Sequence, residues 1–248
     1  MLLTVHKAGS SYVGEIFKEV FARHRYQPFD LMAEVYSGAR RMGDWSEAEA
    51  ERLCTSGGFF GPFRGGHNGL AAHISQARPI IHVRDPRDCI VSHYYSMRYS
   101  HGVPPGYEGE RLLALRESLE CTTIDSYVEN LVICGLCGDE NFCRSFDILH
   151  AIRCARPDAI LSRYEDMVTE FPDWLVGIVE QFGIEIDYEM VIDLIARTNF
   201  LVNLRVEENQ YNHKRQITPG DFQRKLSPRG QALLTAHFAE TLDAFGYT

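Results

Sequence analysis

The stretch LLTVHKAGSSYVGEIF, residues 2–17, indicates how the chain begins to fold. Its first part, Leu2–Val5, is a short apolar run of the kind that forms a buried parallel strand. Beyond Ser10 the apolar residues recur with the spacing of one helical face, at Val13, Ile16, Phe17, Val20 and Phe21. We expect Ser10 or Ser11 to cap this helix, because a short hydroxyl side chain can accept from first-turn N–H groups. The stretch therefore predicts a strand, a tight turn and a helix.

The same unit recurs further along the chain. Pro79–Val83 is a second predicted strand, and it is followed by Asp85 as a helix cap and Pro86 as a first helical residue. A third strand is predicted at Ala159–Arg163. Strands that alternate with helices indicate an α/β fold with a central parallel β-sheet flanked by helices on both faces.

Length and net charge limit the domain organisation and the classes of binding partner. The chain has 248 residues, 45% of them hydrophobic, and we expect a single domain over residues 1–248, although two small domains would also fit. The formal net charge of -9 makes nucleic acid and anionic membranes poor partners, and it argues weakly against long polyanionic acceptors. Any anion site must therefore be a local basic pocket.

The chain has 7 cysteines, an odd and scattered set that is typical of reduced thiols in a cytoplasmic protein. We identify no signal peptide and no run that approaches the ~18 apolar residues of a membrane span. Cys134 and Cys137, with Cys143 nearby, were considered as zinc ligands. A zinc site needs four converging ligands, and no second closely spaced pair exists, so ordinary thiols are favoured.

The turn at residues 7–12 has the chemistry of an anion site. Lys7 supplies a charge, Gly9 allows close approach, and Ser10 and Ser11 supply hydroxyl donors at a helix N-terminus that favours anions. In nucleoside-triphosphate loops the lysine follows the second glycine, whereas here Lys7 precedes Gly9. The pattern predicts a site for a compact dianion, and the alternative is an ordinary turn with a solvated lysine.

A second basic cluster follows the second predicted strand. Arg84 ends that strand, and Ser92 lies about two helical turns further on. An arginine can bind a phosphate through two parallel N–H groups, and the serine can add a third donor. On its own the cluster would also suit a surface group of ion pairs. Lys7 and Arg84 both follow strands, and ligands of parallel sheets bind beyond those strand ends.

These motifs resemble a known family. HKAGSSY resembles the 5′-phosphosulfate loop of the sulfotransferases that use 3′-phosphoadenosine 5′-phosphosulfate (PAPS), and VRDPRDCIVSHYY resembles their 3′-phosphate motif. Three further stretches follow in the family's order: RYEDM at 163–167, TNF at 198–200 and KRQITPGDF at 214–222. The resemblance spans residues 5 to about 226. It implies the P-loop-like sulfotransferase fold.

The resemblance also implies a role for each matching residue. Lys7 would bond the oxygen that bridges phosphorus and sulfur. The 5′-phosphate would be surrounded by Ala8, Gly9, Ser10 and Ser11. The 3′-phosphate would be bound by Arg84, Ser92 and Arg215, and the adenine by Tyr12, Tyr164, Thr198 and Phe200. The product would be 3′,5′-adenosine bisphosphate, and no metal is implied, because a sulfuryl group carries less negative charge than a phosphoryl group.

Two positions depart from the family's pattern. Tyr12 stands where many members have a tryptophan, and Gln216 and Ile217 replace a lysine and a glycine. A tyrosine can still stack on adenine, whereas the second change affects the expected backbone contact of that loop to the 3′-phosphate more than it affects Arg215.

An acceptor hydroxyl must lose its proton, and histidine is the commonest base. His67, after a glycine pair, is the favoured candidate, with His73, a carboxylate or no dedicated base as alternatives. Arg64 either helps to hold the sulfuryl group or is a surface arginine. Residues 30–66 and 99–122 are expected to shape the acceptor site, the second as a mobile surface segment.

The sequence thus predicts sulfuryl transfer from PAPS to a hydroxyl or amine of a small-molecule or carbohydrate acceptor. Two other functions stay open, a metal-dependent nucleotide kinase on a related fold and a non-catalytic protein that binds adenosine bisphosphate. The identity of the acceptor and the oligomeric state are not readable from the sequence.

Overall fold

The computed structural model describes residues 1–29, 57–64, 77–103, 105–134, 140–197, 208–211 and 217–247. The chain divides into two compact units. Unit 1 comprises Met1–Arg84 and Asn141–Thr198, and unit 2 comprises Asp85–Glu140 and Asn199–Thr248. Each unit is described by itself.

Unit 1 is built on a four-stranded sheet in the order β4-β1-β5-β6. All the pairings in it are parallel. The strands are β1 (Leu2–Thr4), β4 (Phe63–Arg64), β5 (Ile80–Val83) and β6 (Ile160–Arg163). Every residue of β1 and β5 is buried, as expected for strands that are covered on both faces. The three predicted strands and the α/β fold class are therefore confirmed.

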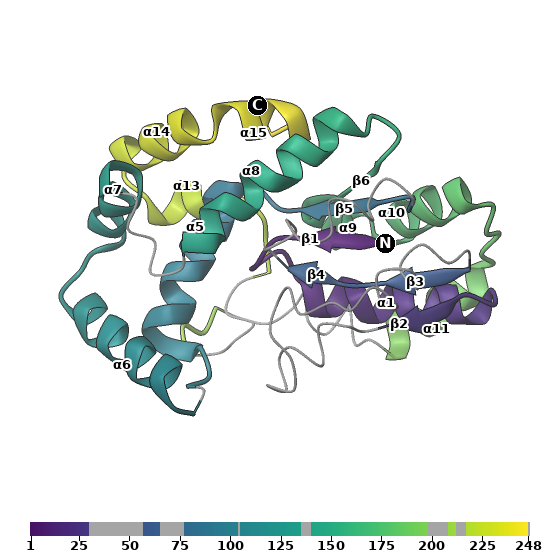
Figure 1. Ribbon diagram of the computed structural model, residues 1–248, viewed down its shortest axis with the longest axis horizontal. Coiled ribbons are helices and arrows are strands. Elements are labelled where there is room, and N and C mark those ends of the chain that lie inside the picture. Colours follow the sequence, from purple (N-terminus) through teal and green to yellow (C-terminus); the bar gives the residue numbers. More distant parts are fainter. Residues whose placement is uncertain are drawn as a thin grey trace. The chain divides into compact units, whose positions relative to one another are not determined.

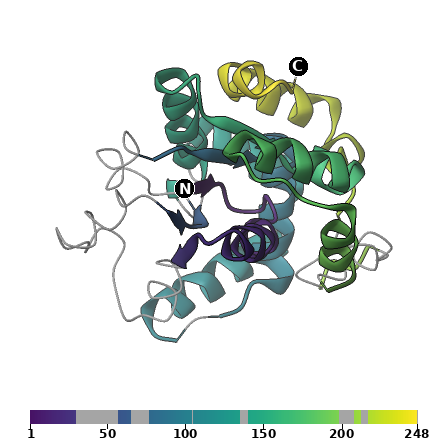
Figure 2. The same ribbon diagram turned by 90° about the vertical axis from the view of Figure 1, so that its right-hand side faces the viewer.

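Helices cover both faces of this sheet. From β1 the chain returns beside it as β4, whereas from β5 it moves the other way to β6. Because such crossovers are right-handed, α1 (Ser10–Arg23) and α8 (Glu140–Ala155) must lie on opposite faces. Figures 1 and 2 show this arrangement, with α10 (Phe171–Val179) on the side of α1. The reversal of direction between β1 and β5 creates a switch point, where ligands of such sheets bind.

The remaining elements of unit 1 complete its core. A two-stranded parallel sheet joins β2 (Gln27–Phe29) to β3 (Gly58–Phe60). The apolar face predicted for α1 is buried, and its Phe17 ring lies 6.3 Å from Phe59 and 5.5 Å from Trp174 of α10. Besides α10, the described part of unit 1 after β6 contains the helices α9 (Tyr164–Thr169), η3 (Glu180–Phe182) and α11 (Tyr188–Arg197).

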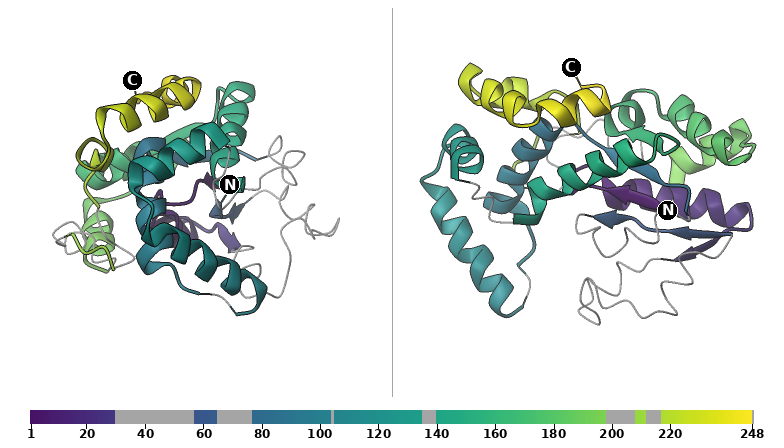
Figure 3. Two further views of the ribbon diagram at one scale, coloured as in Figure 1. Left: turned by 90° about the vertical axis from the view of Figure 1, so that its left-hand side faces the viewer. Right: turned by 45° about the horizontal axis from the view of Figure 1, so that its top comes forward.

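The described part of unit 2 is helical. Its helices are α5 (Pro86–Tyr95), the π-helix η2 (Ser96–Ser100), α6 (Tyr107–Glu120), α7 (Ile124–Cys134), α13 (Asp221–Lys225), α14 (Pro228–His237) and α15 (Ala239–Phe245). Figure 3 shows α14 beside α7, where Oδ1 of Asp125 accepts from the backbone N–H and the hydroxyl of Ser227 at 3.1 and 2.9 Å. None of the described helices is both long enough and apolar enough to span a membrane.

Three local predictions are settled by these elements. Asp85 caps α5 by accepting from the N–H of Arg87 at 2.9 Å, as predicted. The prediction that Ser10 or Ser11 caps α1 is wrong, because Gly9 occupies the cap position in a left-handed conformation and no side chain bonds there. The larger part of residues 99–122, where we expected a mobile surface segment, forms the helix α6.

Candidate functional site

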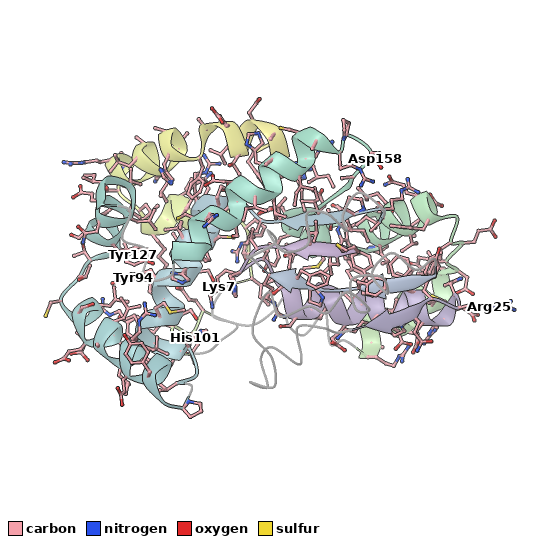
Figure 4. All side chains as sticks on the ribbon, viewed as in Figure 1. Lys7, Arg25, Tyr94, His101, Tyr127 and Asp158 are labelled. Atoms are coloured by element: carbon pink, nitrogen blue, oxygen red, sulfur yellow. The ribbon has the colours of Figure 1, made fainter. Side chains whose placement is uncertain are left out.

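The turn between β1 and α1 has an unusual backbone. Lys7 and Gly9 both have left-handed φ angles, 68° and 71° respectively. Gly9 is required there for a second reason, since a Cβ atom at this position would lie 3.2 Å from the ring of Tyr164. The turn therefore brings the chain from the end of β1 to the start of α1 within a few residues. Figure 4 shows the Lys7 side chain beyond the carboxyl end of β1.

The two serines that follow Gly9 are held by an arginine. Arg64 ends β4 and pairs in register with Thr4 of β1. Its Nε donates to the hydroxyl of Ser10, and its Nη2 donates to the hydroxyl of Ser11 at 2.9 Å. This contact explains why neither serine caps the helix. The Arg64 side chain therefore lies at the start of α1, where it adds a second cation beside the Lys7 turn.

Arg84 lies next to the same turn from the other side. It directly follows β5, is only 4% exposed, and donates from Nη1 to the carbonyl of Lys7 at 3.2 Å. Its guanidinium lies 4.4 Å from the ring centroid of Tyr164, a cation–π distance. Tyr164, at the start of α9, thus contacts both Gly9 and Arg84. The structure brings these residues together at the carboxyl ends of β1, β5 and β6, as the strand arrangement predicts.

A buried polar cluster lies directly beneath the turn. His82, in β5, is fully buried, and its Nε2 lies 2.8 Å from the carbonyl oxygen of Ala8. Its Nδ1 lies 2.7 Å from the hydroxyl of Ser162 in β6, which also accepts from Nε1 of Trp174 at 2.9 Å. Burial lowers the pKa of His82 to about 4, an effect that the hydrogen bond to Ala8 partly opposes. The imidazole is therefore neutral at neutral pH.

In unit 2, a carboxylate anchors the C-terminal loop. Asp88 of α5 is 1% exposed and accepts from the backbone N–H groups of Gly220 and Phe222 at 2.8 and 2.9 Å. The guanidinium of Arg87 lies 4.3 Å from the ring centroid of Phe222. These contacts fix the GDF end of the stretch KRQITPGDF. Ser92 lies on α5, two helical turns beyond its start and partly exposed.

Several predicted site residues lie outside the described part of the chain. They are the base candidates His67 and His73, the adenine contacts Thr198 and Phe200, and Arg215. Cys137 of the zinc candidate also lies outside it. Tyr12 and Ser11 are described and lie in the first turn of α1, where Tyr12 is partly exposed.

The sequence interpretation missed the buried cluster of His82, Ser162 and Trp174. A signal was present, because a polar side chain directly follows an apolar run in both strands, His82 after Ile80 and Ile81, and Ser162 after Ile160 and Leu161. A buried polar group needs a hydrogen-bond partner, so such a residue indicates a specific contact. The sequence also gave no sign that Asp88 would hold a loop more than a hundred residues away.

Comparison with known proteins identifies the family and the fold of the chain. The family model described as "Sulfotransferase domain" matches residues 69–245, from before β5 to the end of α15. The turn with Lys7 precedes the matched region. A crystal structure of mouse sulfotransferase SULT7A1 in complex with PAP matches with a TM-score of 0.62 and 14% sequence identity, over 97% of this chain and 82% of that one. No curated protein sequence shows significant similarity to the chain.

Proposed function

Because the chain belongs to the sulfotransferase family, whose domain model covers most of it, we propose that it transfers a sulfuryl group from PAPS to a hydroxyl or amine of a small-molecule or carbohydrate acceptor. The acceptor itself is not specified by any described residue. The proposal therefore concerns the donor, the transfer step and the residues that serve them.

The observation that carries the proposal is the set of cations around the turn of residues 7–11. Lys7 follows β1, Arg64 ends β4 and Arg84 follows β5, and the two arginines bond to the turn itself. The turn lies at the switch point between β1 and β5, and it opens directly into the N-terminus of α1. Three cations and a helix N-terminus suit a group with concentrated negative charge, such as a phosphosulfate.

The same contacts favour a phosphosulfate over a metal-bound triphosphate. In nucleoside-triphosphate loops the hydroxyl after the lysine binds Mg²⁺. Here the hydroxyls of Ser10 and Ser11 accept from Arg64, and this cation would repel a divalent ion at that place. Lys7 also precedes Gly9, unlike the lysine of such loops. Both features support a donor that needs no metal.

The proposed step is an in-line displacement in which positioning and charge stabilisation do most of the work. The acceptor oxygen or nitrogen bonds to sulfur while the bond from sulfur to the bridging oxygen breaks. Lys7 would donate to that bridging oxygen and so stabilise the departing 3′,5′-adenosine bisphosphate. His67 would take the acceptor's proton, as the favoured base among the candidates.

The other roles follow the resemblance. Ala8, Gly9, Ser10 and Ser11 would surround the 5′-phosphate, and Tyr12, Tyr164, Thr198 and Phe200 would hold the adenine. Arg84, Ser92 and Arg215 would bind the 3′-phosphate. The burial of Tyr164 against Arg84 supports a shared role of these two residues in the nucleotide site.

We also propose that residues 1–248 form a single domain and that the protein is cytoplasmic. The family model runs through both compact units, which supports one functional domain. The cysteines with described side chains, Cys89, Cys121, Cys143 and Cys154, are free thiols, which suits a reducing compartment.

A binding experiment separates the proposed donor from the kinase alternative. The protein should bind 3′,5′-adenosine bisphosphate in the presence of EDTA and bind ATP with Mg²⁺ much more weakly. The reverse preference would favour a kinase and overturn the proposal. A non-catalytic protein would bind the bisphosphate yet move no ³⁵S from labelled PAPS to any member of a panel of alcohols, phenols, sugars and amines.

A further inference from the structure

The cluster of His82, Ser162 and Trp174 connects the inside of the sheet to the donor turn. His82 and Ser162 are 0% and 1% exposed, and they lie opposite each other in the β5–β6 register. Trp174 reaches Ser162 from α10. A valine or leucine would fill either strand position without any need for a partner, so burial alone does not account for a histidine here.

The hydrogen bonds determine which nitrogen of His82 carries the proton. The carbonyl of Ala8 can only accept, so Nε2–H must donate to it. In a neutral ring Nδ1 is then an acceptor, and the hydroxyl of Ser162 donates to it. The oxygen of Ser162 in turn accepts from Nε1–H of Trp174. Each polar group in this series of hydrogen bonds, from Trp174 to Ala8, thereby has a partner. The series allows one tautomer of His82 and one direction of donation.

The bond to Ala8 also fixes the direction of the next N–H group. In a trans peptide the C=O and N–H of one plane point in opposite directions. Because the Ala8 carbonyl points at His82, the Gly9 N–H points away from it. The preceding carbonyl, that of Lys7, accepts a hydrogen bond from Arg84. Arg84 lies two residues after His82, so the two side chains are on the same side of the extended backbone. Two consecutive peptide planes of the turn are therefore held by side chains of β5 and of the residue that follows it.

We propose that His82 is a positioning residue of the donor site, which aims the Gly9 N–H at the 5′-phosphosulfate by holding the Ala8 carbonyl. The assignment rests on the proposed function. Ser162 and Trp174 hold the imidazole in the tautomer that can donate. His82 itself touches no reacting atom.

Two substitutions of His82 distinguish positioning from general support of the fold. In His82→Gln the amide nitrogen reaches about as far as Nε2 and can still donate to Ala8. In His82→Asn the side chain reaches only as far as Nδ1, so it keeps a group near Ser162 and loses Ala8. Both variants replace the ring with a neutral amide, and each serves as the control for the other.

The readout is calorimetric affinity for 3′,5′-adenosine bisphosphate and for adenosine 3′-monophosphate, which lacks the 5′-phosphate. We expect His82→Asn to weaken bisphosphate binding about tenfold, as the loss of one well-aimed bond to a charged group would, and to leave 3′-monophosphate binding unchanged. His82→Gln should stay close to wild type with both. Equal losses in the two variants, or equal losses for the two nucleotides, would overturn the assignment.

A measurement on the unmodified protein covers the case in which His82→Asn does not fold. The Gly9 amide proton signal should move downfield on addition of the bisphosphate and stay in place with the 3′-monophosphate. If the chemical shift of the Gly9 amide proton is the same with the bisphosphate and with the 3′-monophosphate, the assignment is overturned and the proposed donor is unaffected. Failure of wild-type protein to bind the bisphosphate at all would overturn the proposed donor, and this assignment with it.

Discussion

Lys7 carries the most specific chemical role in the proposed mechanism, stabilisation of the leaving group. Lys7 would stabilise the transition state, in which negative charge develops on the bridging oxygen, much more than it stabilises the bound nucleotide. Lys7→Ala should therefore lower kcat by about 100-fold or more, the typical effect of losing one such donor, and change bisphosphate affinity little. Lys18→Ala, which removes a lysine paired with Glu15 on α1, is the matched control. An unchanged rate in Lys7→Ala would remove the assigned role.

Arg84 is expected to recognise the 3′-phosphate. Arg84→Ala should weaken binding of 3′,5′-adenosine bisphosphate by about 1.5–3 kcal/mol, the net worth of a hydrogen bond to a charged group. Adenosine 5′-monophosphate, which lacks the 3′-phosphate, provides the comparison in the same calorimetric titration. Because Arg84 also holds the Lys7 carbonyl, a small loss with the monophosphate is expected. Equal losses with both nucleotides would contradict the placement.

His82 makes stability depend on pH. Its pKa is about 4 in the folded protein, against 6.5 for a solvent-exposed histidine, because burial disfavours the charged ring. The unfolded chain therefore binds the proton more tightly, and stability that is present above pH 6.5 is lost as the pH falls towards 4. At pH 5 the free energy of unfolding should be lower by roughly 2 kcal/mol from this group. Urea unfolding at pH 7 and pH 5 measures the difference.

The variant His82→Gln is the control for that measurement, since an amide does not titrate in this range. Other groups titrate in both proteins, so only the difference between their pH dependences reports on His82. A difference that is absent, or that has the opposite sign, would show that the imidazole is not buried in its neutral form.

At the scale of elements, the start of α1 depends on Gly9. An alanine there would have to adopt the left-handed φ of 71° and would bring its Cβ to 3.2 Å from the Tyr164 ring. Gly9→Ala should therefore lower the free energy of unfolding by about 1–3 kcal/mol and weaken bisphosphate binding. The measurement is urea unfolding together with calorimetry.

Gly177→Ala is the matched control for this change. Gly177 lies within α10, and a Cβ added there meets nothing within 4 Å in the described structure. The substitution should stabilise the protein slightly, because alanine is the better helix former by roughly 0.5–1 kcal/mol. Similar losses in the two variants would mean that the strain argued for Gly9 does not exist.

The elements that were predictable are those with a complete local signal. β1, β5 and β6 each begin with at least two consecutive apolar residues. Asp85 with Pro86 is a local start signal for α5, so the sequence sufficed for these elements. The cap of α1 was predicted wrongly because its deciding contact is not local. Ser10 and Ser11 bond to Arg64, which lies more than fifty residues away, and that contact overrides the local capping preference.

At the scale of the whole molecule, the alternation of strands and helices was enough to predict the fold class. The order of the strands in the sheet could be determined only from the structure. Placement of Lys7, Gly9, Arg84 and Tyr164 at one edge of the sheet follows from parallel strands that end together. The partners of Arg64 and His82 could not be predicted, because both contacts depend on which strands are neighbours.

The family relationship and the donor turn are independent supports of the account. The matched region begins at residue 69, so it includes Arg84 and Tyr164 and excludes Lys7. The proposed role of Lys7 thus rests on the resemblance of its loop to the family's phosphosulfate loop, on its place beyond the end of β1 and on the neighbouring cations. For this reason the account as a whole is tested best by an experiment that depends on both parts of the chain.

The most direct measurement is transfer of ³⁵S from labelled PAPS to the acceptor panel in the presence of EDTA, with wild-type protein and Lys7→Ala assayed side by side. The account predicts a labelled product and stoichiometric 3′,5′-adenosine bisphosphate with the wild type, and a large loss of rate in the variant at nearly unchanged donor affinity. Transfer that requires Mg²⁺, or that proceeds equally well without Lys7, would contradict it.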